Sequence, residues 1–424
     1  MSGVRWLYTT LLFLLIPFIL LRLVWRGRRQ PGYLRHIAER FGHYRETPPR
    51  GALIWLHAVS VGETRAAEPL VKALRIAYPS HRILLTHMTP TGRETSEQLF
   101  GNSILRCYLP YDLPFAVNAF LRRFRPTLGT LLETELWPNL IHGCHTRDVP
   151  LFLVNARLSE RSTRGYARVG SLTRDALGAL AGIGAQTEAD AARLRTLGAG
   201  AIMVTGNLKF DRGPSSKDLE LGATFRTWTG GQRTVFVAAS TREGEEELVL
   251  DAIQNAPAEL LVIIVPRHPQ RFDEVAKQLE RRGVVYQRRS APAFINPATR
   301  VWLGDSMGEL FAYYAASDIA FIGGSLLPLG GQNLLEACAV GRPVLIGPHS
   351  FNFVEATRLA VEAGAAIEVA DSSELGSIVG ELLSDPERRL RMGEAGIALM
   401  REHQGATQRT LALLHTHESY AGRS

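Results

Sequence analysis

The sequence predicts an α/β protein built from two doubly wound halves, with an apolar helix at the N-terminus. Short apolar segments alternate with helical patterns from Ala52 to about Thr205, and the same alternation restarts at Val235. Regular alternation is typical of a parallel sheet with helices on both faces. The chain has 424 residues, which is too long for one typical core, so two domains are expected. Two such halves predict a cleft between them, with sites at the C-terminal ends of the strands.

Residues 1–30 are predicted to form a membrane anchor. Residues 6–21, between Arg5 and Arg22, carry no formal charge and are mostly Leu, Ile and Phe. With the apolar residues beyond Arg22, the segment approaches the roughly 20 residues needed to cross a bilayer. A cleaved signal peptide is the main alternative, but arginines follow the segment instead of a small-residue cleavage site. The positive-inside rule predicts a single pass with the body of the protein in the cytoplasm.

The positive charge of the chain is confined to this end. The formal net charge is +7, and the first fifty residues hold nine Arg and two Glu, which gives 9 − 2 = +7. The remainder sums to zero, which argues against a basic body that binds nucleic acid. Residues 33–44 continue the basic and aromatic composition and are expected to lie against anionic lipid headgroups.

Residues 31–212 and 213–424 are predicted to be the two Rossmann-like domains. The strands expected in the first are Leu53–His57, Arg82–Thr86, Ile104–Tyr108, Thr127–Leu132, Leu151–Val154 and Ile202–Val204, with helices at Ala66–Ala77, Phe115–Phe124 and Ala189–Leu197. Those expected in the second are Val235–Ala239, Leu260–Val265, Val284–Tyr286, Val301–Leu303, Ile319–Ile322 and Val344–Ile346. Lys209–Thr229, which contains Gly213 and Pro214, is predicted to be the linker. The final helical stretch, 385–415, is expected to pack back across the domains.

A glycine-rich loop in the second half is the first candidate for a binding site. The apolar run Ile319–Ile322 ends in Gly323 and Gly324, a second glycine pair follows, and a helical pattern begins at Asn333. Strand, glycine loop and helix present backbone N–H groups to a phosphate. A turn followed by a capping box of Asn333 and Glu336 explains the same residues. This order, with the short helix predicted at 308–316 before it, resembles the nucleotide-sugar site of GT-B glycosyltransferases.

Charged side chains follow several predicted strands of the first half. Glu63 lies in a short turn after Leu53–His57, where a carboxylate suits a general base or simply the N-terminus of a helix. Glu133 and Glu135 follow the strand that ends at Leu132, and Lys209 follows the strand at 202–204. Cleft residues and ordinary loop or cap residues both fit this pattern.

Two further strand ends in the second half carry candidate phosphate ligands. Ser240 and Thr241 precede a helix, as phosphate ligands or helix caps do. Pro266 and Arg267 end the next strand, where Arg267 is aimed at the place of a phosphate or base.

The cysteines and histidines do not predict a metal site or a disulfide framework. Cys107, Cys144 and Cys338 are far apart and form no CxxC spacing, which fits a reducing compartment. His142 and His145 flank Cys144 in a predicted helix without a fourth ligand and are interpreted as packing and surface residues.

Several motifs together resemble the bacterial 3-deoxy-D-manno-octulosonic acid (Kdo) transferases, which are membrane-anchored GT-B enzymes. The matching segments occur in the family's order over nearly the whole chain: 60–63 (SVGE), 88–92 (MTPTG), 108–112 (YLPYD), 133–139 (ETELWPN), 155–158 (NARL), 208–211 (LKFD), 266–269 (PRHP) and 347–353 (GPHSFNF). Gln332 stands where many members have His, and Gln270 where many have Glu. The resemblance implies two Rossmann-like domains that face a cleft, the first for the acceptor and the second for the donor.

The resemblance also implies roles for individual residues. Glu63 would be the general base, and Glu133 and Lys209 would stabilise the transition state. The CMP site would consist of Pro266, Arg267, Met307, Gly308, Glu309, Asn333, Leu334, Leu335 and Glu336. Kdo would pass from CMP-Kdo to a lipid A precursor of the lipid IVA type with inversion at the anomeric carbon. No cofactor or metal is expected, and the partners would be CMP-Kdo, the lipid A precursor and the lipids of the bacterial inner membrane, without nucleic acid.

Three alternatives are weighed against this interpretation. A membrane-anchored GT-B transferase that uses a UDP-sugar would differ in the motifs from Glu63 to Phe353. An inert membrane-tethered binding module would have no reason to keep Glu63, Lys209 and Arg267 together. A reductase would carry GxGxxG after the first strand of a half, and neither half does.

Overall fold

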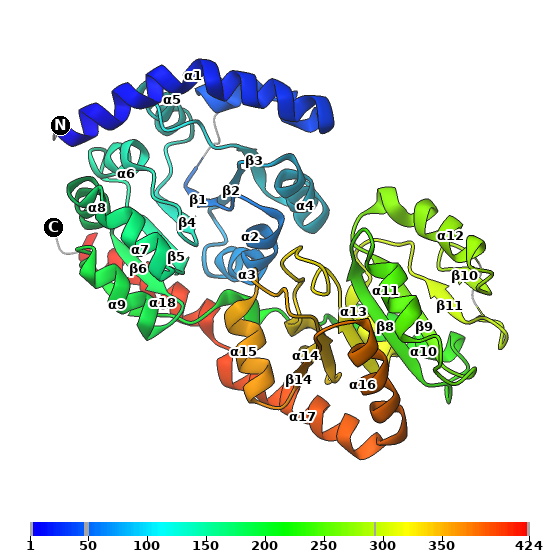
Figure 1. Cartoon of the computed structure of the whole chain (residues 1–424). Coiled ribbons are helices and arrows are strands. Elements are labelled where there is room, and N and C mark those ends of the chain that lie inside the picture. Colours follow the sequence, from blue (N-terminus) through cyan, green and yellow to red (C-terminus); the bar gives the residue numbers. More distant parts are fainter. Residues whose placement is uncertain (1–2, 46–50, 292–293, 422–424) are drawn as a thin grey trace. The chain divides into compact units, whose positions relative to one another are not determined.

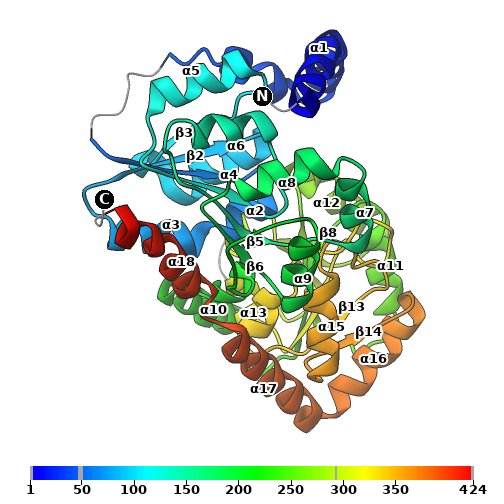
Figure 2. The ribbon, with the colours of Figure 1, turned by 90° about the vertical axis from the view of Figure 1, so that its left-hand side faces the viewer.

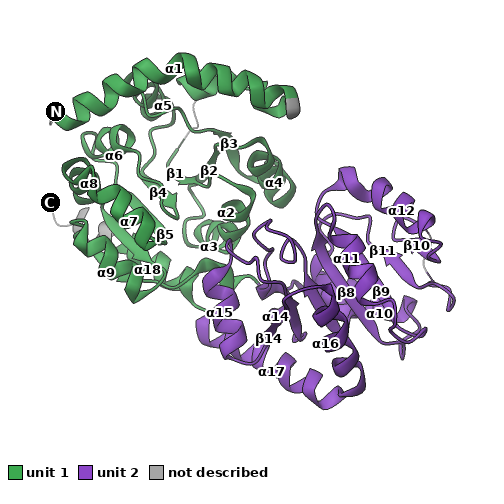
Figure 3. Ribbon diagram, in the orientation of Figure 1, with its two compact units in different colours: residues 1–212, 404–424 green, residues 213–403 purple. Residues whose placement is uncertain are grey.

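The computed structural model describes residues 3–45, 51–291 and 294–421. The chain forms two compact units (Figure 3), of which unit 1 comprises residues 1–212 and 404–424 and unit 2 comprises residues 213–403. Each unit contains its own seven-stranded sheet, and each is described by itself below.

The sheet of unit 1 is entirely parallel in its pairing and has the order β3-β2-β1-β4-β5-β6-β7 (Figure 1). Its strands are β1 (Leu53–His57), β2 (Arg82–His87), β3 (Leu105–Tyr108), β4 (Leu128–Leu132), β5 (Leu151–Ala156), β6 (Gly182–Ala185) and β7 (Ile202–Val204). Strands β1, β4, β5 and β6 are buried along their whole length. Their near-continuous apolar sequences therefore reflect a sheet that is covered on both faces.

Helices cover the two faces of this sheet and create two hydrophobic cores. One core joins the sheet to α5, α6, α8 and α9, and the other joins it to α3 and to α18 near the C-terminus. The helices are α1 (Gly3–Arg29), α2 (Val61–Ala66), α3 (Glu68–Ala77), α4 (Pro90–Phe100), α5 (Pro114–Phe124), α6 (Pro138–His145), α7 (Glu160–Ala167), α8 (Gly170–Gly178), α9 (Glu188–Thr196) and α18 (Ala406–Ala421), with 3-10 turns η1 (Pro31–Leu34), η2 (Ile37–Phe41), η3 (Gly101–Ser103) and η4 (Leu208–Asp211).

Unit 2 repeats this architecture with the strand order β10-β11-β9-β8-β12-β13-β14, again parallel throughout. Its strands are β8 (Val235–Thr241), β9 (Leu261–Pro266), β10 (Tyr286–Arg288), β11 (Val301–Leu303), β12 (Ile319–Ile322), β13 (Val344–Ile346) and β14 (Ala366–Glu368). Its helices are α10 (Ser216–Trp228), α11 (Glu245–Ala252), α12 (Phe272–Arg281), α13 (Leu310–Ala316), α14 (Leu335–Ala339), α15 (Val354–Glu362), α16 (Ser372–Ser384) and α17 (Pro386–His403), with η5 (Pro269–Arg271).

The α/β class with two doubly wound parallel sheets is confirmed, and the differences from the sequence prediction are local. The predicted linker is wrong in part, because α10 occupies most of it and begins at a capping box of Ser215 and Asp218. The strand predicted at 284–286 lies two residues later, as β10. Strands β6 and β14 were missed, because a Gly-Ile-Gly-Ala segment and a three-residue edge strand lack the β-branched runs that predict strands.

Each sheet has one point where the direction of winding reverses. In unit 1 the reversal lies between β1 and β4, and in unit 2 it lies between β8 and β12. Loops that leave the carboxyl ends of these two neighbouring strands diverge to opposite faces, and ligands of open α/β sheets bind in the crevice this creates. The loops after β1, β4, β8 and β12 are therefore the places to examine for chemistry.

Helix α1 is long and apolar enough, by length and composition, to cross a membrane. Figure 2 shows α1 nearly end-on, beside the part of unit 1 that contains α5 and α6. Residues 33–44, which are expected to lie against headgroups, include the end of η1 and all of η2, and Glu39 and Arg40 among them are buried.

We predict that Gly129→Ala destabilises unit 1. Gly129 lies in β4, and an added Cβ would come within 2.7 Å of the Trp55 ring and 2.8 Å of Leu151 Cδ1. Overpacking of this kind costs typically about 1–3 kcal/mol. Gly165→Ala is the control, since Gly165 lies in α7 with open space around it and the change should stabilise by about 0.5–1 kcal/mol. Urea unfolding of both variants measures this, and equal stabilities would show that β4 is packed differently.

Candidate active-site residues of the two units

Glu63 lies in the first turn of α2, which follows β1 at the switch point of unit 1. Ser60 is the N-cap of α2, and its hydroxyl accepts a hydrogen bond from the Glu63 backbone N–H at 3.4 Å. The carboxylate folds back over the same turn: Oε2 accepts from the Val59 N–H at 2.7 Å and Oε1 accepts from the Ser60 hydroxyl at 3.0 Å. The side chain is 8% exposed. Glu63 is therefore held in one orientation by its own turn.

The start of α4 supports this turn from the neighbouring strand end. Thr89 is the N-cap of α4, and its hydroxyl donates to the Val59 carbonyl at 3.0 Å. Gly92 lies in the first turn, where an added Cβ would approach the Val59 carbonyl oxygen to 3.2 Å. A larger residue at Gly92 would push the two turns apart. This contact explains why the sequence pairs a Ser60–Glu63 turn with a Thr89–Gly92 turn.

The surroundings of Glu63 favour its protonated form. Its pKa is raised to about 8, mainly by burial and then by the negative charge of Glu133, while the hydrogen bond from Val59 opposes the shift. Burial also raises the pKa of Glu135 to about 7. Two carboxyl groups that titrate near neutrality at a strand edge are typical of sites that move protons.

Glu133 and Lys209 form an ion pair at the same edge of the sheet. Lys209 Nζ lies 3.2 Å from Glu133 Oε1, and both side chains are partly buried. Glu133 directly follows β4 and has φ of +57°, which is rare for a residue with a side chain. Lys209 lies in η4, whose N-cap Asn207 accepts from the Lys209 N–H at 3.0 Å. The structure thus brings the three residues predicted to be catalytic in this half into one cluster.

Asn155, the second-last residue of β5, connects this strand to η4. Asn155 has φ of +54°, its side-chain oxygen accepts from the Leu208 N–H at 3.0 Å, and its carbonyl accepts from Gln186 at 2.9 Å. Asn155 therefore fixes the start of η4 and, through it, Lys209. The sequence reasoning matched Asn155 to the family but gave it no role.

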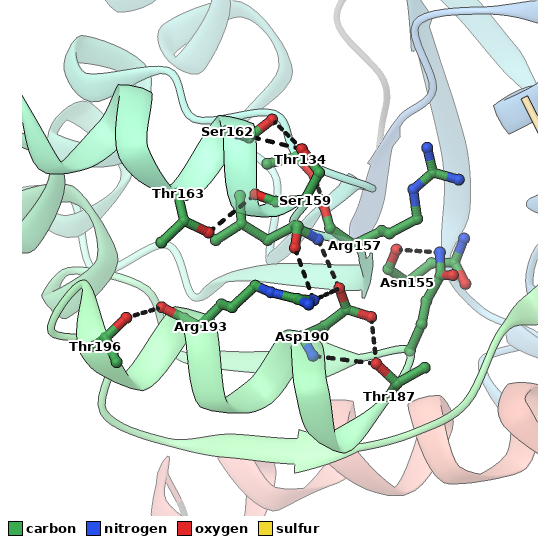
Figure 4. A network of polar contacts seen from close by, with 12 residues as sticks. Thr134, Asn155, Arg157, Ser159, Ser162, Thr163, Thr187, Asp190, Arg193 and Thr196 are labelled. Carbon is green, nitrogen blue, oxygen red and sulfur yellow. Dashed lines mark hydrogen bonds and ion pairs between the residues drawn. The ribbon is translucent and has the colours of Figure 1, made fainter. Parts of the chain in front are cut away.

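Arg157 is the first residue of the loop after β5 and is a second residue to which the sequence reasoning assigned no role. Figure 4 shows its guanidinium pointing away from the network that holds the loop. The network includes Asp190, which accepts from the Leu158 N–H at 2.8 Å, and the Thr134 hydroxyl, which donates to the Arg157 carbonyl. A hydrogen-bonded backbone thus presents an exposed cation beside Thr134. The signal in the sequence was its position just after a buried strand.

Two buried histidines lie beneath the Ser60 turn. Both Nδ1 atoms lie near oxygen atoms of neighbouring chain segments: that of His57 is 3.0 Å from the Thr86 hydroxyl, and that of His87 is 2.9 Å from the Ala58 carbonyl. Burial lowers the pKa of His57 to about 3 and that of His87 to about 4. Both are neutral at physiological pH, so they support the turn without adding charge to the Glu63 site.

In unit 2, the glycine loop after β12 is held by Glu245, at the start of α11. Its carboxylate accepts hydrogen bonds from the N–H groups of Gly324, Ser325 (2.9 Å) and Leu326 (3.1 Å), and from Arg242 at 2.9 Å. Glu245 has no exposed surface. Burial raises its pKa, and these backbone hydrogen bonds oppose the shift. The sequence reasoning missed Glu245, because the stretch Glu243–Glu247 resembles a solvated acidic helix start.

Pro266 and Arg267 lie where β9 ends, beside this loop. The Arg267 N–H donates to the Thr241 carbonyl at 2.9 Å, and its Nε donates to the Gln332 side chain at 3.1 Å. Ser240, with φ of +59°, turns β8 toward the same place. Gln332 stands where the family resemblance implies His. Its side chain accepts a hydrogen bond from Arg267, which is one of the residues proposed to bind CMP.

The remaining proposed CMP residues fall into two groups. Met307 and Gly308 are exposed after β11, and Glu309 pairs with Arg289 at 3.0 Å and with Ser306. In the second group, Asn333 and Leu334 precede α14, and Leu335 and Glu336 are its first two residues. The Asn333 side chain accepts a hydrogen bond from the Leu335 N–H at 3.3 Å. Leu334 and Leu335 have no exposed surface and Glu336 is 3% exposed. The two leucines therefore offer backbone groups, and Glu336 a buried carboxylate.

Comparison with known proteins identifies the family. Residues 35–212 match the family described as 3-Deoxy-D-manno-octulosonic-acid transferase (kdotransferase). A 3-deoxy-D-manno-octulosonic acid transferase of Bordetella pertussis is 46% identical over 97% of this chain and 98% of its own. The chain belongs to the Kdo transferase family. A second transferase of this name, from Haemophilus influenzae, is 41% identical over the same shares of the two chains. Kdo transfer is therefore the enzyme's activity.

A solved structure supports the fold. HepE of Anabaena in complex with UDP is similar over 87% of this chain and 100% of its own, with a TM-score of 0.58 and 16% sequence identity. This likeness shows the GT-B-like fold of two Rossmann-like sheets. Among the residues the structure describes, no group of three or more His, Cys, Asp or Glu is arranged to hold a metal ion.

We predict that Glu245→Gln loosens the glycine loop. Glutamine has one acceptor oxygen in place of two and brings an NH₂ group toward backbone N–H donors, so buried donors lose partners. An unsatisfied buried donor costs about 1–3 kcal/mol, which should appear as a lower free energy of unfolding. Glu247→Gln, an exposed position of the same helix, is the control and should change stability by less than about 0.5 kcal/mol. Equal urea midpoints for the two variants would contradict the assigned role of Glu245.

Proposed function

We propose that the enzyme transfers Kdo from CMP-Kdo to a lipid A precursor of the lipid IVA type, with inversion at the anomeric carbon. Unit 1 would bind the acceptor and unit 2 the donor. The observation that carries this proposal is the cluster of Glu63, Glu133 and Lys209 at the switch point of unit 1. It combines a buried carboxyl that titrates near pH 8 with a paired lysine, as acid–base chemistry requires.

In the proposed reaction, Glu63 takes the proton from the attacking sugar hydroxyl of the acceptor. The hydroxyl oxygen forms a bond to the anomeric carbon of Kdo while the bond from that carbon to the phosphate oxygen of CMP breaks. CMP leaves with the electron pair of that bond. Attack from the side opposite to the leaving group inverts the anomeric centre. Lys209, oriented by Glu133, stabilises the negative charge that develops in the transition state.

We assign the donor's nucleotide to Pro266, Arg267, residues 307–309 and residues 333–336. The support is their position at the switch point of unit 2 and at the neighbouring strand ends, where Glu245 fixes a loop of backbone N–H groups. Arg267, held by Gln332, supplies a cation for the phosphate. Glu336, buried at the start of α14, supplies a carboxylate for the ribose hydroxyls.

We further propose that α1 attaches the enzyme to the bacterial inner membrane, with both units on the cytoplasmic side. The support is the length and composition of α1 together with the arginines that follow it. Hydropathy alone predicts a single pass for this helix. A lipid acceptor gives the attachment a purpose, because confinement to the surface raises the effective concentration of acceptor.

Incubation with CMP-Kdo and a tetra-acylated lipid A precursor tests the proposal as a whole. Mass spectrometry should show the precursor gaining Kdo. A parallel reaction with a UDP-sugar should leave the lipid unchanged. Transfer from the UDP-sugar and none from CMP-Kdo would overturn the assigned donor.

We predict that Glu63→Gln lowers the rate of Kdo transfer by about 10²–10⁴, the range for loss of a general base. The wild-type rate should rise with pH up to about 8, because Glu63 must lose its proton to act and its pKa is raised to about 8. Since Gln does not titrate, the variant should lack this rise. Transfer rates from pH 6 to pH 9 measure both effects.

The control for this variant is Glu160→Gln. Glu160 is an exposed first-turn acid of α7, so its loss removes a helix-dipole interaction without touching the cluster. It should keep the wild-type rate and pH profile, and CMP affinity should be unchanged in both variants. A near-normal rate of Kdo transfer by the Glu63→Gln variant would show that Glu63 is not the base, and Glu133 or Glu135 would become the candidate.

We predict that Glu336→Ala weakens CMP binding by about 1–3 kcal/mol, the contribution of a hydrogen bond to a charged group. Isothermal calorimetry with CMP measures the change, and Glu394→Ala, at an exposed position of α17, is the control. A folded Glu336→Ala protein with wild-type CMP affinity would show that Glu336 serves the start of α14 alone.

A further inference from the structure

Helix α1 contacts the body of unit 1 along almost its whole length. Its buried and half-buried residues recur every three or four positions and so form one stripe: Arg5, Tyr8, Thr9, Leu12, Ile16, Ile19, Leu23 and Gly27. This spacing places them on a single face of the helix. Figure 1 shows the same arrangement, with α1 extended over α5 and α6. The helix thus lies along unit 1.

Polar contacts fix the first half of the stripe. The Tyr8 hydroxyl donates to Asp112 Oδ2 at 2.9 Å, and the side chains of Thr9 and Asn139 exchange hydrogen bonds at 3.1 and 3.2 Å. Asp112 also accepts from the N–H groups of Asn139 and Leu140 at 2.9 and 2.8 Å, and it is 2% exposed. Helix α1 therefore completes the hydrogen bonds of the buried carboxylate that caps α6.

Contacts near its C-terminal end hold the second half. Leu23 is 6% exposed, and the Arg26 guanidinium lies 5.4 Å from the centre of the Tyr33 ring in η1. Near the middle of the helix, the partly exposed rings of Phe13 and Phe115 lie 6.2 Å apart. At Gly27, an added Cβ would come within 2.3 Å of Leu34 in η1. A larger residue at Gly27 would displace the Leu34 side chain, so α1 and η1 pack closely here.

The opposite face of α1 is apolar and exposed. Its large hydrophobic residues include Trp6 (64% exposed), Leu14 (72%) and Leu21 (69%), and the face continues through Leu7, Leu11, Leu15, Phe18, Val24 and Trp25. A continuous apolar strip of this length is far more than a water-facing helix carries. The exposed Arg22 lies near the C-terminal end of this strip, and the exposed Arg26, Arg28 and Arg35 follow it, where they complement anionic lipid headgroups.

These two faces set α1 apart from a helix that crosses a bilayer. A crossing helix is surrounded by lipid for about 30 Å, whereas α1, with 27 residues and a length of about 40 Å, is in contact with unit 1 from Arg5 to Gly27. Crossing would break the Tyr8–Asp112 and Thr9–Asn139 contacts and place their polar groups in hydrocarbon, which is costly.

We propose that α1 lies in the plane of the membrane surface, with its Trp6–Trp25 face inserted in the lipid and its Arg5–Gly27 stripe on unit 1. This inference rests on the membrane attachment in the proposed function and specifies its form. The face then sits about 5–10 Å into the boundary between headgroups and acyl chains. The N-terminus and the catalytic body are on the same side of the membrane.

Depth measurements on the full-length protein in liposomes of zwitterionic and anionic phospholipid test this directly. Leu7→Cys, Leu14→Cys and Leu21→Cys each carry a fluorophore, which is quenched by lipids with spin labels at shallow or deep acyl positions. Cys107, Cys144 and Cys338 are buried and should not react in the folded protein. If α1 lies in the plane of the membrane, the fluorophores at all three positions should have the same shallow depth. A crossing helix would place the fluorophore at position 14 near the bilayer centre and the other two nearer the surfaces. The latter pattern would overturn the proposal.

Two further arms make the result decisive. Ile16→Cys, on the stripe that faces unit 1, should be much less quenched by either lipid than Leu14→Cys, and equal quenching would contradict packing on the body. Gly3→Cys should be labelled by a membrane-impermeant thiol reagent in inverted membrane vesicles and not in intact spheroplasts, and the reverse would indicate a crossing. None of these measurements needs substrate, so they stand or fall independently of the assigned donor and acceptor.

Discussion

A carboxylate buried at the carboxyl end of a parallel sheet is stable only where hydrogen-bond donors meet it, and this constraint shapes both units. Each has a glutamate just after its first strand, in the first turn of the helix that follows: Glu63 after β1 and Glu245 after β8. Four backbone N–H groups meet Glu245, so its oxygens are occupied and it organises a loop. Glu63 receives one backbone N–H and one hydroxyl, and it lies beside another carboxylate. The same position therefore serves structure in unit 2 and, in the proposed reaction, proton transfer in unit 1.

The sequence was sufficient for the features that depend on repetition. Alternating apolar and helical segments predicted the two parallel sheets, and strand-end positions led to Glu63, Glu133 and Lys209, which the fold brings together. Features that depend on distant partners were not predictable. Glu245 looks like one of several surface acids until the Gly324–Leu326 loop folds onto it, and Asn155 gives no sign that it fixes η4, 53 residues further on.

Helix α1 shows the same limit at the level of a whole element. Its composition predicts a membrane helix and does not distinguish a crossing from an in-plane arrangement, because Tyr8 and Thr9 resemble interfacial residues at the end of a span. The distinction comes from Asp112 and Asn139, more than a hundred residues away. A hydropathy pattern measures how apolar a helix is, but it does not show which face of the helix packs against the rest of the protein.

The contacts that hold α1 also continue toward Glu63. Gly27 packs on Leu34 in η1, and Gly32 of η1 packs on Pro90, where an added Cβ would lie 2.8 Å from the ring. Pro90 begins α4, whose N-cap Thr89 holds the Val59 carbonyl of the Ser60 turn. Helix α1 is thus linked to the proposed base by a short series of turns that contain glycines in close contact, a proline and helix caps. For a lipid acceptor held at the membrane surface, such a linkage would fix the distance of its reacting hydroxyl from Glu63, which a flexible tether would leave variable.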